Sequence, residues 1–204
     1  VPWLGPAEFA QRSREGIVID TREPEAFAGG HLAGAYSIWQ GGLAPYAGWI
    51  ADAQMPIYLL ADDPGSLVEA RLALARIGFD HVAGALRGGF SAWRNSGSPI
   101  ARSGTVSAPE LVDRLGETVV LDVREASEFA AGHIPGARHV PVGELEAQID
   151  QLGLDRGRPI ASVCSVGHRG SLGASVLCRA GFSRVANLLG GMTAWQNCGL
   201  PLEE

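Results

Sequence analysis

An internal repeat governs what this chain can fold into. Residues 18–23, 27–35 and 88–93 recur, with modest changes, as residues 120–125, 129–137 and 190–195, each block 102 positions further on. Solenoid repeats have units of about 20–50 residues, so a period of this length indicates two copies of a whole domain. The 204 residues suffice for two domains of ordinary size. We therefore predict domains at residues 1–100 and 103–204, with residues 95–99 and 102–104 as the linker.

Each copy alternates short apolar runs with helical patterns. The predicted strands are residues 16–20, 55–61, 119–123 and 160–163. Amphipathic helices are predicted from residues at helical spacing, namely Leu67, Ala70, Leu74 and Ile77, and in the second copy Leu172, Ser175, Val176 and Arg179. Gly78 and Gly181 are predicted to end these helices. The alternation predicts an α/β fold in which each domain has a parallel sheet with helices on both faces.

One loop of the second copy carries the candidate chemistry. It follows the strand at residues 160–163, precedes a helix predicted over residues 170–180, and so lies where parallel sheets place their sites. Loop N–H groups and a helix N-terminus stabilise a thiolate, which is the nucleophilic form of cysteine. We predict Cys164 as the catalytic residue. The predicted substrate-binding residues are Ser165, Val166, Gly167, His168 and Arg169.

The corresponding loop of the first copy lacks these groups. Ala61 falls opposite Cys164, and the residues after it include Asp62 and Asp63 but no thiol and no arginine. Two carboxylates at this place would repel an anionic substrate. We expect the first domain to be non-catalytic, with a role in stabilising and covering the second domain or in binding a partner.

Composition excludes several classes of function. A net charge of −6 argues against a general nucleic-acid-binding protein, and no apolar stretch reaches the ~20 residues that span a bilayer. The three cysteines are an odd number without CxxC spacing, so we expect neither disulfides nor a metal site, and a reducing, cytoplasmic compartment. Residues 186–191 lack the GxGxxG pattern, and no cofactor is expected. The first residue is Val1, which is compatible with a piece of a longer chain.

Five short motifs of the second half occur in an order that is familiar from one family. They are residues 122–125, the pair Glu128-Phe129, residues 132–137, Cys164-x-x-Gly167-x-Arg169, and Gly190-Gly191-Met192-x-x-Trp195. Together they resemble the rhodanese family of sulfurtransferases, and the first half matches the same elements except at the loop. The resemblance covers essentially the whole chain, as a tandem of rhodanese-like domains of the thiosulfate sulfurtransferase type. It implies an α/β fold and a catalytic cysteine that carries a sulfane sulfur as a persulfide.

The resemblance implies a two-step transfer through Cys164. The thiolate takes the outer sulfur of thiosulfate or of a low-molecular-weight persulfide, and cyanide, sulfite or a thiol then removes it. Arg169 is expected to orient the donor's negative end or to brace the loop. His168 would add charge near neutral pH, and Gly167 would permit backbone angles that a side chain forbids.

Two other functions stay open. Cysteine-dependent phosphatases and arsenate reductases, some of them built on this fold, have one residue more between cysteine and arginine than the four found here. The shorter loop should enclose one sulfur but not a tetrahedral phosphate. A non-catalytic sulfur carrier or sensor is the second alternative. Similar loops also occur in rhodanese modules fused behind a persulfide dioxygenase, so an N-terminal domain missing from this sequence is considered as well.

Other reactive or aromatic side chains are interpreted as structural. Cys178 is expected to be a buried thiol rather than a resolving cysteine, and Cys198 a surface thiol. Several residues occur in both copies, including the copy without a nucleophile, and are therefore expected to make structural contacts: Asp20 and Arg22 with their counterparts Asp122 and Arg124, His31 and His133, and Trp93 and Trp195.

Overall fold

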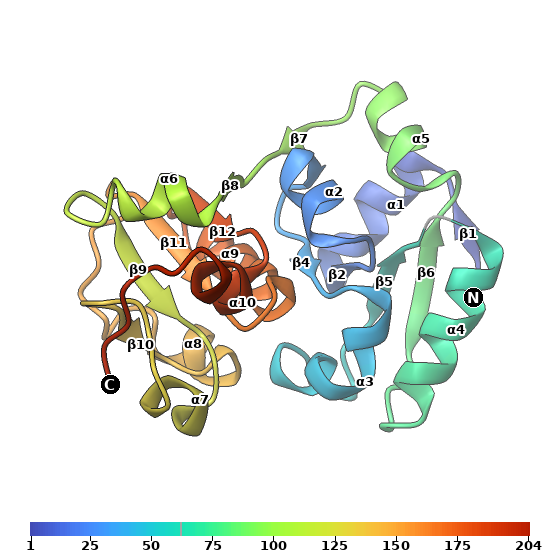
Figure 1. Ribbon diagram of the computed structural model, residues 1–204. Coiled ribbons are helices and arrows are strands. Elements are labelled where there is room, and N and C mark those ends of the chain that lie inside the picture. Colours follow the sequence, from blue (N-terminus) through green and yellow to red (C-terminus); the bar gives the residue numbers. More distant parts are fainter. Residues whose placement is uncertain (62) are drawn as a thin grey trace. The chain divides into compact units, whose positions relative to one another are not determined.

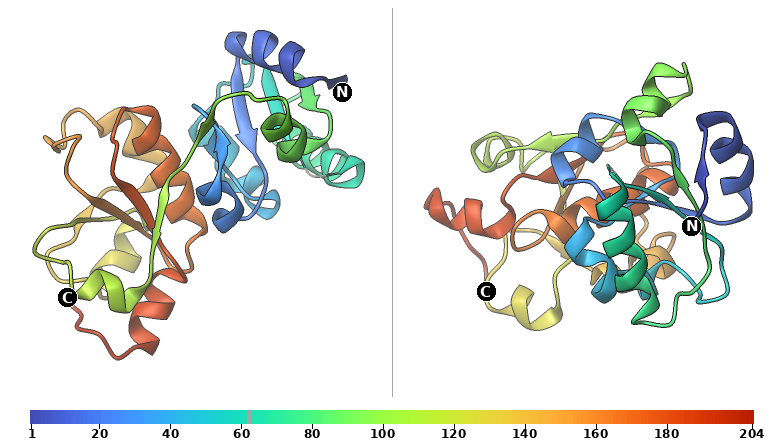
Figure 2. Two further views of the ribbon diagram at one scale, coloured as in Figure 1. Left: turned by 90° about the horizontal axis from the view of Figure 1, so that it is seen from above. Right: turned by 90° about the vertical axis from the view of Figure 1, so that its right-hand side faces the viewer.

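The computed structural model describes residues 1–61 and 63–204 (Figure 1). They form two compact units, Val1–Arg102 and Ser103–Glu204. Each unit is built around a five-stranded parallel sheet with helices on both faces, so the predicted α/β class is confirmed (Figure 2). In the described part of the chain, no helix combines the length and the apolar character that crossing a membrane requires.

The first unit has the strand order β1-β6-β5-β2-β4. These strands are β1 (Trp3–Leu4), β6 (Val82–Leu86), β5 (Ile57–Leu60), β2 (Ile17–Asp20) and β4 (Tyr36–Ser37). The α-helices are α1 (Pro6–Arg12), α2 (Pro24–Gly29), α3 (Leu43–Tyr46), α4 (Pro64–Ala75) and α5 (Gly89–Asn95), with short 3-10 turns at Ser13–Glu15, Gln40–Gly42 and Ala47–Trp49. One core cluster joins Phe9 of α1 and Trp93 of α5 to Tyr58 and Leu60 of the central strand.

The second unit repeats this order as β10-β9-β11-β12-β8. Its strands are β10 (Arg138–His139), β9 (Val119–Asp122), β11 (Ile160–Val163), β12 (Val185–Leu188) and β8 (Gly104–Val106). Its helices are α6 (Ala108–Val112), α7 (Ala126–Ala130), α8 (Val142–Gln148), α9 (His168–Arg179) and α10 (Gly191–Asn197). Alternate residues of β11 serve opposite faces: Ala161 and Val163 join Trp195 of α10 in one core cluster, whereas Ser162 lies beneath α9.

Each unit is closed by a segment that folds back after its last helix. In the first unit β7 (Ile100–Ala101) pairs antiparallel with β3 (His31–Leu32). In the second, Glu203 makes the equivalent bridge with His133. The indole N–H of Trp93 donates to the carbonyl of Pro99 at 2.9 Å, and that of Trp195 to Pro201 at 2.8 Å. Both tryptophans are buried, which confirms their predicted packing role.

Some element limits differ from the predictions. Gly104 is not part of a linker but the first residue of β8, where it pairs with Ala186, and Asn95 is the last residue of α5. The strand was missed because Gly104–Val106 is too short to show an apolar pattern. Ile77 lies beyond the end of α4 and is exposed, and α9 begins at His168. Eight consecutive residues of α9 are buried, so its predicted stripe was too narrow.

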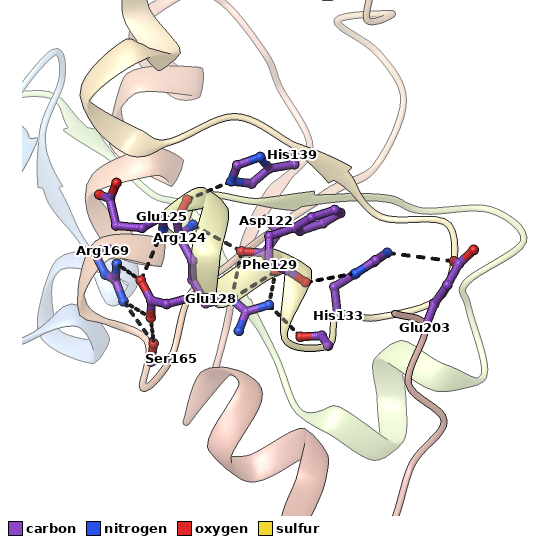
Figure 3. Close-up of polar contacts among 11 residues, drawn as sticks. Asp122, Arg124, Glu125, Glu128, Phe129, His133, His139, Ser165, Arg169 and Glu203 are labelled. Carbon is purple, nitrogen blue, oxygen red and sulfur yellow. Dashed lines mark hydrogen bonds and ion pairs between the residues drawn. The ribbon is translucent and has the colours of Figure 1, made fainter.

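A buried ion pair lies at the carboxyl end of β2 in the first unit and at that of β9 in the second. In the second unit the Nε of Arg124 donates to one Asp122 oxygen at 2.9 Å and Nη2 to the other at 2.6 Å. The same Nη2 donates to the carbonyl of Gly132 at 2.9 Å, which ties the end of the α7 turn to the strand (Figure 3). Arg22 makes the same contacts with Asp20 and Gly30. The predicted structural pairing is confirmed in both copies.

We predict that Arg124→Leu destabilises the second unit by about 3–5 kcal/mol, because it leaves the Asp122 carboxylate buried without its partner. Arg22→Leu should affect the first unit equally. Arg12→Leu is the control, since the ion pair of Arg12 with Glu8 is exposed and its loss should cost about 0–1 kcal/mol. Urea unfolding followed by hydrogen exchange in each unit measures these effects. Equal losses for Arg12→Leu and Arg124→Leu would contradict the prediction.

Candidate functional site

Cys164 comes directly after β11, at the carboxyl edge of the second sheet. It is 1% exposed, and the backbone N–H of Gly167 donates to its Sγ at 3.1 Å. Gly167 has a φ of +104°, a conformation that side chains disfavour, and it is the N-cap of α9. The loop therefore turns back on itself and directs a backbone donor at the sulfur, as loops that bind anions do.

The start of α10 supports the loop from a second side. Met192 N–H donates to the carbonyl of Cys164 at 2.8 Å, and Thr193 N–H to that of Ser165 at 2.9 Å. This approach requires glycine at position 191, where φ is +54° and a Cβ would overlap the Cys164 carbonyl oxygen. The Gly-Gly pair before α10 thus holds the loop through its backbone.

Arg169 is engaged by a carboxylate of α7. Its Nη1 and Nη2 donate to the two oxygens of Glu128 at 2.6 and 2.7 Å. Ser165 completes the group, because its hydroxyl donates to Glu128 at 2.7 Å and accepts from Arg169 Nη2 at 2.8 Å (Figure 3). Hydrogen bonds from Arg169 are the main cause that lowers the pKa of Glu128 to about 2. Of the two roles predicted for Arg169, this geometry favours bracing the loop.

The sequence motifs include Glu128 but indicate no function for it. Its contact with Arg169 spans 41 positions of sequence, which no local pattern reveals. The repeat does hold a signal: Ala26 takes the place of Glu128 in the first copy, which also lacks the loop arginine. The charged partners are thus both present in one copy and both missing from the other.

The remaining predicted loop residues lie at or near the surface. Val166, at the tip of the loop, is 52% exposed, and His168 is half-buried at the first position of α9. Cys178 lies near the other end of α9, about 15 Å along the helix from His168. It is half-buried rather than buried, and burial raises the pKa of its thiol. Cys198 is exposed, as predicted. The structure does not bring these cysteines to the loop.

The histidines beside the site make structural contacts. His133 Nδ1 lies 3.1 Å from the carbonyl of Phe129, and its ring stacks on the Phe129 ring at 3.7 Å (Figure 3). His31 stacks on Phe27 in the same way. His139, which the sequence did not single out, stacks on Phe129 as well, and its Nε2 lies 2.8 Å from the carbonyl of Arg124. Within the residues that the structure describes, no three potential ligands gather to form a metal site.

The equivalent place in the first unit is arranged differently. Ala61 is fully buried, and Asp63 caps α4 by accepting from the N–H groups of Gly65 and Ser66 at 2.7 and 3.0 Å. The hydroxyl of Ser66 also donates to Asp63, and this is the main cause that lowers the pKa of Asp63. A carboxylate thus caps the N-terminus of α4, whereas the N-cap residue of α9 in the second unit is Gly167, which has no side chain. Asp62, the other predicted carboxylate, lies outside the described residues.

Comparison with a family model gives two matches. The model for the rhodanese-like domain fits residues 5–96 and again residues 107–198. A sulfurtransferase of Allochromatium vinosum is 31% identical over 100 residues, which are 48% of this chain and 92% of that protein. Thiosulfate sulfurtransferase GlpE of Pseudomonas aeruginosa is 36% identical over 92 residues, 44% of this chain and 82% of that enzyme. For YrkF of Bacillus subtilis, at 37% identity, the match covers 37% of this chain and only 40% of that protein's length.

Two solved structures match with TM-scores below 0.5. A thiosulfate sulfurtransferase from Pseudomonas aeruginosa matches all of this chain and 44% of its own, with 25% identity and a TM-score of 0.46. A rhodanese-related protein from Thermoplasma volcanium matches 49% of this chain and 97% of its own, with 27% identity and a TM-score of 0.46.

We predict that Glu128→Gln reduces the acid sensitivity of the second unit. Because the Glu128 pKa falls from 4.5 unfolded to about 2 folded, its ion pair stabilises the fold fully above the unfolded value and loses this effect as the pH falls towards 2. Glutamine keeps an acceptor for Arg169 but does not titrate. Unfolding free energies of both proteins, measured from neutral pH down to about 2, should converge at the acid end. A constant difference would refute this.

We predict that Gly191→Ala disrupts the loop at Cys164, because the added Cβ overlaps the Cys164 carbonyl oxygen. Gly199→Ala is the matched control: its φ is +65°, but a Cβ there has nothing within 4 Å. The control should lose only about 1–2 kcal/mol of unfolding free energy, which is the cost of a non-glycine residue in the left-handed region. The variant at position 191 should lose more and should also change the rate at which Cys164 reacts with iodoacetamide. Equal behaviour of the two variants would argue against this support.

Proposed function

The chain belongs to the rhodanese-like domain family, with one such domain in each half, and from this we propose that it is a sulfurtransferase acting through a Cys164 persulfide. The donor is thiosulfate or a low-molecular-weight persulfide, and the acceptor is cyanide, sulfite or a thiol. Relatives named as sulfurtransferases support sulfur transfer in general. The observation that carries the assignment to Cys164 is the Gly167 N–H donated to its Sγ at 3.1 Å.

The proposed first step is a displacement at the donor's outer sulfur. The Cys164 thiolate forms a new S–S bond with this sulfur, while the S–S bond of thiosulfate breaks and its electron pair leaves on sulfite. The product is a Cys164 persulfide anion, so charge is conserved without transfer of a proton. Cyanide then attacks the terminal sulfur, leaves as thiocyanate and restores the thiolate. With an organic persulfide as donor, the leaving group is the corresponding thiolate.

A backbone donor of the loop lies at the sulfur that is negatively charged as a thiolate before the transfer and again after it. Gly167 N–H points at Sγ, and backbone donors are most effective where little water reaches them. Arg169 supports the loop rather than offering an uncompensated charge, because both of its terminal nitrogens contact Glu128. In this proposal Arg169 is a positioning residue, and the first domain, with Ala61 and the Asp63 cap, has a non-catalytic role.

The same contacts argue against phosphate chemistry. A phosphatase of this type needs a guanidinium to clamp the oxygens of the substrate phosphate. Here that guanidinium is held by Glu128, and Cys164 is 1% exposed. A single sulfur atom suits this position better than a tetrahedral phosphate.

We predict that wild-type protein incubated with thiosulfate or glutathione persulfide gains about 32 Da on Cys164, the mass of one sulfur. Cys164→Ser should abolish both this gain and thiocyanate formation, because serine cannot form a persulfide. Cys178→Ser and Cys198→Ser are controls that should retain both. Intact-mass and peptide mass spectrometry, with a thiocyanate assay, measure the outcome. Activity retained by Cys164→Ser would refute the assignment, and a persulfide that no acceptor discharges would favour a sulfur carrier.

A further inference from the structure

A polar pair lies beneath the first turns of α9. Ser162 of β11 and Asn187 of β12 are partners in the sheet register, and they are 0% and 2% exposed. The Nδ2 of Asn187 donates to the carbonyl of Gly167 at 2.9 Å. No described residue hydrogen-bonds the Oδ1 of Asn187 or the Oγ of Ser162. Burying a polar atom without a partner destabilises a fold, so this pair calls for an explanation.

The helix above makes room for the pair. A Cβ at Gly170 would overlap the Oδ1 of Asn187, and a Cβ at Gly173 would lie 2.7 Å from the Oγ of Ser162. Glycine is a poor residue for a helix interior, because it loses more conformational freedom than alanine does. The second unit therefore accepts two unfavourable features at one place, polar atoms in the core and glycines in the helix above them.

The first unit shows that the fold does not need this arrangement. Its β5 and β6 are paired with Leu59 opposite Ala85, just as Ser162 lies opposite Asn187. Alignment of Ala61 with Cys164 places Leu59, Leu67 and Ala70 opposite Ser162, Gly170 and Gly173, and the sheet register places Ala85 opposite Asn187. All four residues of the first unit are apolar and buried. The apolar layer accompanies the loop without a cysteine, and the polar layer accompanies the loop with one.

We propose that Asn187 is a positioning residue for the reaction of Cys164. It holds the carbonyl of Gly167, so that the N–H of the same residue stays directed at the sulfur. This inference rests on the proposed function. The two hydrogen bonds meet in one residue: Gly167 donates to Cys164 Sγ at 3.1 Å and accepts from Asn187 at 2.9 Å.

Glycine makes this restraint necessary. Gly167 must be glycine to reach a φ of +104°, but the same freedom lets its flanking peptides rotate towards other orientations. Its carbonyl also accepts from Ser171 N–H at 2.9 Å, which belongs to the helix itself. Asn187 supplies a second, side-chain donor from the sheet, so the turn is fixed to the rigid strands and not only to the helix. In the second step the S–S bond of the persulfide breaks and negative charge returns to Sγ of Cys164. An N–H held in advance at Sγ therefore speeds this step rather than the binding of thiosulfate.

The test replaces Asn187 with leucine, which has a similar shape and no polar atoms, and with alanine, which is smaller. Both variants should lower kcat for sulfur transfer about tenfold, with KM for thiosulfate unchanged, and should slow the alkylation of Cys164 by iodoacetamide to a similar degree. Unfolding by urea is measured alongside, and Asn187→Leu should be no less stable than wild type because its unpaired amide oxygen is gone. If leucine prevents folding, the alanine variant decides on the same kinetic criteria.

Ser162→Ala is the matched control. It removes the other unpaired buried atom from the same layer, but that hydroxyl makes no hydrogen bond to any described loop residue, so kcat should stay at the wild-type value. A wild-type kcat in a folded Asn187 variant, or a fall in kcat that Ser162→Ala reproduces, would overturn the proposal. Wild-type protein that forms no persulfide would instead refute the proposed function, so the two failures are distinguishable.

Discussion

The buried pair of Asp122 and Arg124 is the interaction on which the carboxyl edge of the second sheet depends. It fixes the chain where β9 ends and, through the carbonyl of Gly132, fixes the far end of the α7 turn. Glu128 lies on α7 and holds Arg169, whose loop carries Cys164. Two sets of charge-assisted contacts, linked through the backbone of α7, therefore connect the sheet to the loop of the candidate nucleophile. Such contacts are stronger and better oriented than neutral ones.

The repeat separates the frame of the domain from its chemistry. Both units keep the buried ion pair, the stacked histidine and the same strand order. They differ at the loop and at the residues that hold it, where alanine in the first unit stands opposite Glu128, Cys164 and Asn187, namely Ala26, Ala61 and Ala85. Because these three positions differ together, the first unit keeps the packing of the family. It lacks the side chains that form and hold the loop at Cys164.

Periodicity and repetition in the sequence were enough to predict the α/β class and two inner strands of each sheet, because buried parallel strands are nearly continuous apolar runs. They failed where an element is short, as at Gly104, and where a helix is buried on many sides, as in α9. The partners of the loop were also missed, since Glu128 and Asn187 reach it from strands and helices distant in sequence. The differences between the two copies hold a signal for these partners, but the spacing of residues along the chain does not reveal contacts over such distances in sequence.

The closing segments have a consequence for how such a chain arises. In each unit the residues after the last helix return to the histidine beside the buried ion pair, through Ile100–Ala101 in one and Glu203 in the other. A tryptophan anchors this return in both. Every strand described here finds its partner within its own half. A DNA segment encoding one half therefore carries a complete set of pairing partners, and its duplication yields a second folded body whose loop can then diverge while the first is preserved.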